Sequence, residues 1–124
     1  MSRRTLVSRL TYTLDCCDAR TLSAFWAEVL GYSRRGPHGD FWPLVPPDSV
    51  AEPWFTLQQV SEPKSGKNRM HLDIHVADLD EEARRLEALG ARRVSGNAVV
   101  MGSFSWFVMA DPEGNEFCIV RPGD

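Results

Sequence analysis

MHLDIHVADLDEEARRLEALG, residues 70–90, is the stretch of sequence that decides the fold. Apolar and polar residues alternate over residues 69–77, which is the period of a half-buried strand. Asp78 then stands at a candidate helix N-cap, with a glutamate three residues later as in a capping box. Apolar residues recur at helical spacing over residues 79–89, and Gly90 is suited to end that helix. The stretch therefore predicts a strand followed by a helix.

The same order of signals occurs earlier in the chain. Residues 5–15 alternate imperfectly and predict a strand, and Asp18 is a second candidate N-cap. An apolar stripe over residues 19–30 then ends at Gly31, and Trp26 within it is expected in the core. The two halves share this spacing rather than a close sequence, so we predict two structurally related modules.

Short strands are expected after each helix. The Gly- and Pro-rich residues 32–50 predict two short strands with loops, and residues 53–60 predict a third. After the second helix we expect strands over residues 91–95, 97–101, 103–110 and 115–120. The sequence Asp-Pro-Glu-Gly-Asn at residues 111–115 suits a turn between the last two of these strands.

The predicted fold is α+β and contains two βαβββ modules. A polar segment, residues 61–68, separates a first module of about residues 5–65 from a second of about residues 66–122. We expect both modules to belong to a single domain over residues 1–124. Each helix must cover one face of its sheet, so the prediction is a cupped mixed or antiparallel sheet with helices on its outer face.

Composition excludes several classes of protein. The net charge of −3 does not suggest a nucleic-acid-binding protein. No apolar run approaches the roughly 18 residues of a membrane span, and the N-terminal residues lack the apolar region of a signal peptide. The three cysteines include the adjacent Cys16 and Cys17, which does not fit a disulfide scaffold. We therefore expect a cytoplasmic protein with neither nucleic acid nor membrane as a partner.

Strand parity places polar and aromatic residues on the sheet face that the helices leave open. In the strand over residues 69–76, His71 and Asp73 point away from the side of Leu72 and Ile74. The same rule places the following residues on the open face: Thr11, Trp54, Gln58, Arg69, Trp106, Val108, Glu116 and Cys118. A solvated sheet face would give this pattern too. An aromatic wall with a few polar groups is, however, typical of a ligand site.

Three segments resemble the vicinal-oxygen-chelate superfamily of glyoxalases, bleomycin-resistance proteins and dioxygenases. They are DCCDARTLSAFWAEVLGY, MHLDIHVADLDEEARRLEALGA and WFVMADPEGNEFCIV, which begin at Asp15, Met70 and Trp106. The run KNRMHLDI, from Lys67, is similar to the glyoxalase-like branch. The resemblance extends over nearly the whole chain. It implies the two-module fold described above and a small-molecule ligand, and it is compatible with a homodimer.

The resemblance also implies a metal site, from which this sequence departs. The four ligand positions of metal-dependent members fall at Thr11, at Gln58 or Thr56, at His71 and at Cys118. Only His71 is a standard ligand of that set. A thiolate could bind zinc, but threonine and glutamine are poor partners for it. Glu116, or His75 together with His71, could supply substitute donors. We therefore expect the usual metal site to be missing, while a divalent metal stays an open alternative.

The missing ligands favour a binding protein for an aromatic or antibiotic-like small molecule. Its ligand would stack on Trp54 and Trp106. Arg69, Gln58 and Glu116 would orient it.

An enzyme is the alternative, with a lyase, isomerase or dioxygenase-like reaction. His71 would then act as a metal ligand or as a general base, with Glu116 or Asp73 as its partner. The sequence leaves both classes open.

Overall fold

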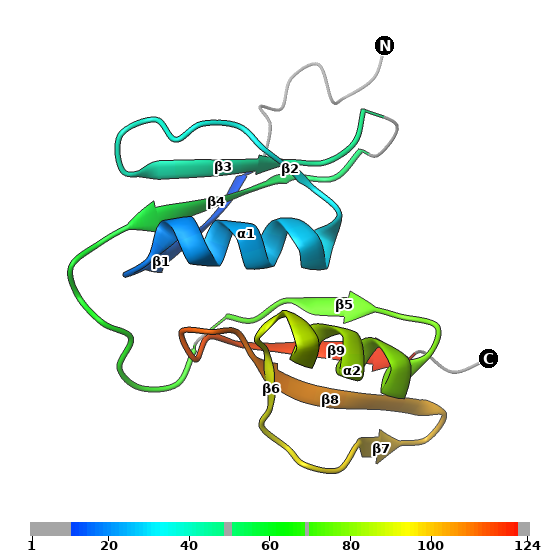
Figure 1. Ribbon diagram of the computed structural model, residues 1–124. Coiled ribbons are helices and arrows are strands. Elements are labelled where there is room, and N and C mark those ends of the chain that lie inside the picture. The colour runs from blue at the N-terminus through cyan, green and yellow to red at the C-terminus, as the bar shows by residue number, and fades with distance from the viewer. Residues whose placement is uncertain (1–10, 49–50, 69, 122–124) are drawn as a thin grey trace. The chain divides into compact units, whose positions relative to one another are not determined.

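The computed structural model divides into two compact units, residues 1–63 (unit 1) and residues 64–124 (unit 2). It describes residues 11–48, 51–68 and 70–121. The predicted α+β class is confirmed, because the described residues of each unit form one helix and a mixed sheet (Figure 1). In the described part of the chain, no helix is long and apolar enough to cross a membrane.

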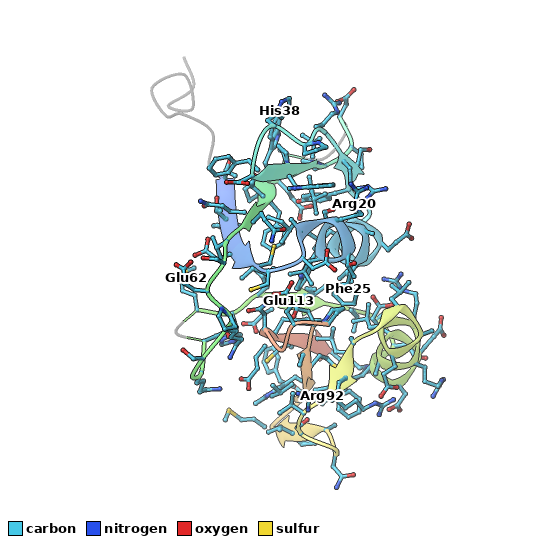
Figure 2. All side chains as sticks on the ribbon, turned by 60° about the vertical axis from the view of Figure 1, so that its left-hand side comes forward. Arg20, Phe25, His38, Glu62, Arg92 and Glu113 are labelled. Atoms are coloured by element: carbon cyan, nitrogen blue, oxygen red, sulfur yellow. The ribbon has the colours of Figure 1, made fainter. Side chains whose placement is uncertain are left out.

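Unit 1 has the predicted βαβββ order. Its elements are β1 (Thr11–Cys16), α1 (Ala19–Leu30), β2 (Ser33–Arg34), β3 (Phe41–Val45) and β4 (Trp54–Gln59). The sheet order is β1-β4-β3-β2, with β1 parallel to β4 and the other pairs antiparallel. The part of the predicted first strand that precedes Thr11 lies outside the described residues. Two connecting segments carry exposed side chains, His38 between β2 and β3 and Glu62 after β4 (Figure 2).

Local capping and packing place α1 where the sequence predicts it. The Asp18 carboxylate accepts a hydrogen bond from the Thr21 amide at 3.2 Å, which satisfies one of the free amides of the first turn. Gly31, with φ of 70°, ends the helix in the left-handed conformation. Trp26 is 2% exposed, and its ring lies 5.3 Å from that of Phe55 on β4. Trp26 is thus a core residue, and the Phe55 side of β4 faces α1.

Unit 2 has the same order with one additional short strand. Its elements are β5 (Asp73–His75), α2 (Leu79–Leu89), β6 (Arg92–Arg93), β7 (Val99–Met101), β8 (Phe104–Ala110) and β9 (Glu116–Arg121). The sheet order is β5-β9-β8-β6, β7 also pairs with β8, and β5 is parallel to β9. The helix begins after Asp78, whose carboxylate accepts a hydrogen bond from the Glu81 amide at 3.0 Å.

The strand predicted over residues 69–77 is shorter in the structure. Only Asp73–His75 is assigned as strand, although the Cys118 amide also donates to the Leu72 carbonyl at 2.8 Å. Met70 was predicted on the helix side but is 75% exposed. It precedes the part of the segment that pairs with β9, so the β5–β9 pairing does not hold it against α2.

Candidate functional site

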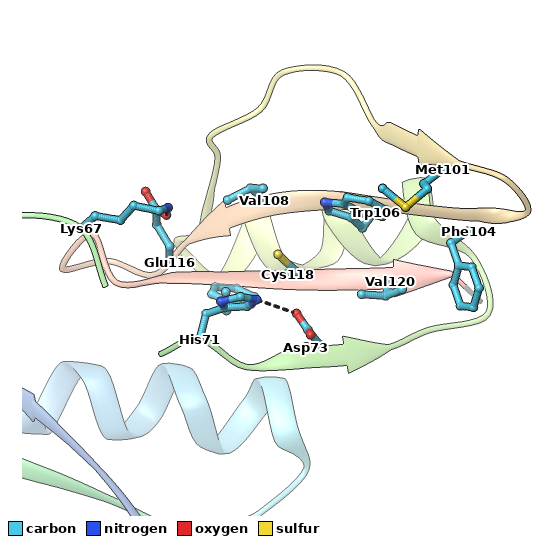
Figure 3. Close-up of a pocket in the computed structure, with 11 residues that line it drawn as sticks. Lys67, His71, Asp73, Met101, Phe104, Trp106, Val108, Glu116, Cys118 and Val120 are labelled. Atoms are coloured by element: carbon cyan, nitrogen blue, oxygen red, sulfur yellow. Dashed lines mark hydrogen bonds and ion pairs between the residues drawn. The ribbon is translucent and has the colours of Figure 1, made fainter. Parts of the chain in front are cut away.

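A cavity of about 490 Å³ lies on the sheet of unit 2, on the face away from α2 (Figure 3). Its wall is largely apolar and is formed by Met101, Phe104, Trp106, Val108 and Val120. Register explains this wall, because Trp106 on β8 lies directly across from Val120 on β9. Side chains alternate along a strand, so the intervening residues pack on the other face, under α2.

The rest of the cavity lining consists of the buried Phe117 and five polar residues: Lys67, His71, Asp73, Glu116 and Cys118. His71 Nε2 lies 3.1 Å from Asp73 Oδ1, and the Lys67 ammonium lies 2.7 Å from Glu116 Oε1. Cys118 lies directly across from Asp73 in the parallel β5–β9 pair. Potential ligand atoms of His71, Asp73 and Cys118 all lie within 4.8 Å of one another. We call these three residues the donor cluster.

Hydrogen bonding, burial and neighbouring charges shift the pKa of two cavity groups. The hydrogen bond and charge of Lys67 lower the pKa of the Glu116 carboxyl, so Glu116 is ionised at neutral pH. Burial, followed by the negative charge of Asp73, raises the pKa of the Cys118 thiol. A protonated thiol is a poor nucleophile. The site therefore suits hydrogen bonding by Cys118 better than covalent catalysis by it.

The β8–β9 turn holds these side chains in register. Asp111 is 4% exposed, and its carboxyl oxygens accept hydrogen bonds from the Glu113 amide at 2.9 Å and the Asn115 amide at 2.9 Å. The Asn115 side-chain amide donates to both carboxyl oxygens, at 3.1 and 2.9 Å. The turn thus fixes which residue of β9 lies across from each residue of β8, including Cys118 across from Val108.

Three of the predicted site residues belong to unit 1. Thr11 lies directly across from Trp54 in the parallel β1–β4 pair, and Gln58 follows on the same side of β4. That side is opposite to Phe55, which faces α1, so these three residues share the face away from the helix. Their convergence with the cavity residues of unit 2 stays a prediction. Arg69 lies outside the described residues.

A family model described as a glyoxalase-like domain matches residues 11–120. The chain belongs to the glyoxalase-like domain family. This finding confirms the resemblance to the glyoxalase, bleomycin-resistance and dioxygenase superfamily. The comparison of this glyoxalase-like chain with curated proteins finds no match.

Solved structures of the superfamily share its fold. A glyoxalase/bleomycin resistance protein/dioxygenase family enzyme from Burkholderia phytofirmans PsJN has a TM-score of 0.72 and 21% identity, over 90% of this chain and 95% of that chain. A variant of the fosfomycin resistance protein FosX from Listeria monocytogenes, complexed with Mn(II) and dihydroxypropylphosphonic acid, has a TM-score of 0.71 and 17% identity, over 91% and 89%. A Nocardioides member of the superfamily has a TM-score of 0.69 and 17% identity, over 98% and 94%. Identities this low show the fold alone.

The donor set of this glyoxalase-like chain differs from the substitutes that the sequence suggested. Asp73, expected to orient His71, completes a three-residue cluster with it. Glu116 instead pairs with Lys67, and His75 is not part of the cluster. One nitrogen, one oxygen and one sulfur donor are the ligand types that zinc accepts, and three protein ligands are the number found in its open sites. The residues present therefore fit a divalent ion of that type.

Sequence reasoning missed five residues that line the cavity, namely Lys67, Met101, Phe104, Phe117 and Val120. Lys67 lies in the polar linker, where no periodic pattern marks a direction for its side chain. Met101 and Phe104 are 67% and 49% exposed and flank the β7–β8 turn. In the sequence these two apolar residues stand on either side of a short turn. That pattern predicts a hairpin, but it does not predict that the hairpin borders the cavity.

Proposed function

We propose that this chain binds a small molecule with a flat apolar body, such as an aromatic or antibiotic-like metabolite, in the cavity of unit 2. One observation carries the proposal: the cavity joins an apolar wall around Trp106 to a polar end at His71 and Asp73. Its volume of about 490 Å³ lies within the roughly 300–1,000 Å³ of small-molecule sites. The proposal does not require the four-ligand metal site of the superfamily. For Thr11, Trp54 and Gln58 of unit 1, a role in ligand binding stays a prediction from the sequence.

The indole of Trp106 would carry much of the affinity, and the polar end would orient the ligand. Stacking on an aromatic side chain contributes about 0.5–1.5 kcal/mol beyond the area that it buries. A neutral hydrogen bond to His71 would contribute about 1 kcal/mol. Replacing Trp106 should therefore weaken binding at least as much as replacing His71.

The test is a titration of the EDTA-treated protein with a panel of flat aromatic compounds, followed by calorimetry and tryptophan fluorescence. For a compound that binds, Trp106→Ala should reduce affinity at least about fivefold. A stacking energy of about 1 kcal/mol corresponds to that factor, since 1.4 kcal/mol corresponds to a factor of ten. Trp42→Phe is the matched control, because Trp42 lies on β3 of unit 1 beneath the guanidinium of Arg20. Equal affinity in wild type and Trp106→Ala would contradict the stacking proposal.

An enzyme is the second candidate, and the contact between His71 and Asp73 favours it. A carboxylate 3.1 Å from the imidazole can fix its orientation and tautomer, as general bases require. His71→Ala should then reduce turnover about 10²–10⁴-fold. Loss of turnover with retained binding would decide for the enzyme.

A further inference from the structure

We infer that the donor cluster, His71, Asp73 and Cys118, is a three-ligand site for a thiophilic divalent ion of the zinc type, with its open coordination position toward the cavity. All three ligands come from unit 2. The inference rests on the proposed function in one respect, namely that this cavity is the ligand-binding site.

Backbone register brings the three donors together. His71 and Asp73 are two residues apart on an extended segment, so they project from the same side of it. The parallel pairing of β5 with β9 places Cys118 directly across from Asp73, and the hydrogen bond from the Cys118 amide to the Leu72 carbonyl anchors the segment between the two donors. The cluster is therefore built on paired backbone.

The separations suit a tetrahedral ion after small side-chain adjustments. Zinc bond lengths of about 2.0–2.3 Å place tetrahedral ligand atoms roughly 3.3–3.7 Å apart. In the structure His71 Nε2 is 3.1 Å from Asp73 Oδ1, and all pairs in the cluster lie within 4.8 Å. The largest correction is thus about 1 Å, which side-chain rotation can supply. His71 and Asp73 are each 52% exposed at the side chain, so an ion can reach them from solvent.

The sulfur of Cys118 decides which ion the site prefers. Thiolate and imidazole suit zinc and other late transition metals, whereas Mg²⁺ and Mn²⁺ are suited by carboxylate, carbonyl and water oxygens. The donor cluster offers only one carboxylate, since Glu116 is paired with Lys67. The site should therefore discriminate against the Mn(II) that the FosX neighbour holds. Three protein ligands leave a fourth position for a donor atom of a cavity ligand.

Cobalt(II) reports this site directly, because thiolate ligation gives it an intense charge-transfer absorption. EDTA-treated protein titrated with cobalt chloride should develop this band and reach saturation at one equivalent. Zn²⁺ should abolish the band, and Mg²⁺ should leave it unchanged. Absence of the band would overturn the inference. The aromatic-compound titration of the same metal-free protein tests the cavity separately, so the two failures are distinguishable.

Matched variants assign the ligands. Cys118→Ser should remove the band, whereas Cys17→Ser, at an exposed thiol of unit 1, should keep it. Asp73→Asn should weaken cobalt binding by at least the roughly 10–100-fold that is typical of lost second-shell partners. His75→Ala, on the same strand, should bind as wild type does. Far-ultraviolet circular dichroism checks that each variant folds. A band that survives Cys118→Ser, or equal loss in His75→Ala and Asp73→Asn, would overturn the assignment.

Discussion

Replacing Asp111 by alanine should destabilise the chain through the β8–β9 turn. Its carboxyl oxygens accept hydrogen bonds from the amide of Glu113 and from both the backbone and the side-chain amide of Asn115, at 2.9–3.1 Å. Asn115 is 7% exposed, so its two donors would lose their partner away from water. A buried donor without a partner costs about 1–3 kcal/mol. Two such donors would cost about 2–6 kcal/mol in the free energy of unfolding. Because the turn can relax in part, we expect a loss of about 2–4 kcal/mol.

Urea unfolding followed by tryptophan fluorescence and circular dichroism measures this loss. Asp111→Asn should cost roughly half as much, because it retains one oxygen for the two backbone amides. Ser103→Ala, at an exposed residue of the β7–β8 turn, is the control and should stay within about 0.5 kcal/mol of wild type. If Asp111→Ala behaves like Ser103→Ala, the turn is not held by the Asp111 carboxyl and the reasoning fails.

Three further predictions concern unit 2. Lys67→Met should raise the pKa of Glu116 toward its ordinary value, since the hydrogen bond from Lys67 is the largest cause of the lowered pKa, ahead of the charges of Lys64 and Arg92; carbon-detected NMR titration measures the change. In wild type the stabilisation from this lowered pKa is present at neutral pH and is lost as the pH falls through the pKa of Glu116 in the folded protein. Asp78→Ala removes the acceptor for the Glu81 amide and should cost about 1 kcal/mol in urea unfolding. Leu86→Ala, at a side chain with 0% exposure, should cost about 2–5 kcal/mol in the same assay.

The sequence predicts the helices well because their signals are local. Asp18 and Asp78 each accept a hydrogen bond from an amide three residues later, and each helix ends at a glycine with positive φ. These interactions involve neighbours along the chain, so spacing alone identifies them. The length of β5 is different, since it depends on how far the segment runs alongside β9. Met70 satisfies the alternating pattern but lies before the paired part, and the pattern carries no information on that limit.

The donor cluster depends on long-range register, which is why the sequence could identify its members but not their grouping. Parity places His71, Asp73, Glu116 and Cys118 on one face, yet it does not say which of them lie close together. The cluster requires that Asp73 lie across from Cys118. If β5 were shifted by two residues along β9, Asp73 would lie across from Glu116 instead, and every side chain would still point to the same face. The β8–β9 turn cannot set this pairing, because β5 reaches β9 through tertiary packing. Glu116 is not available as a metal ligand, because Lys67 of the linker forms an ion pair with it. The donor set of the cavity therefore depends on the β5–β9 register and on the Lys67–Glu116 ion pair. Both join residues that are far apart in the sequence, so no local pattern predicts them.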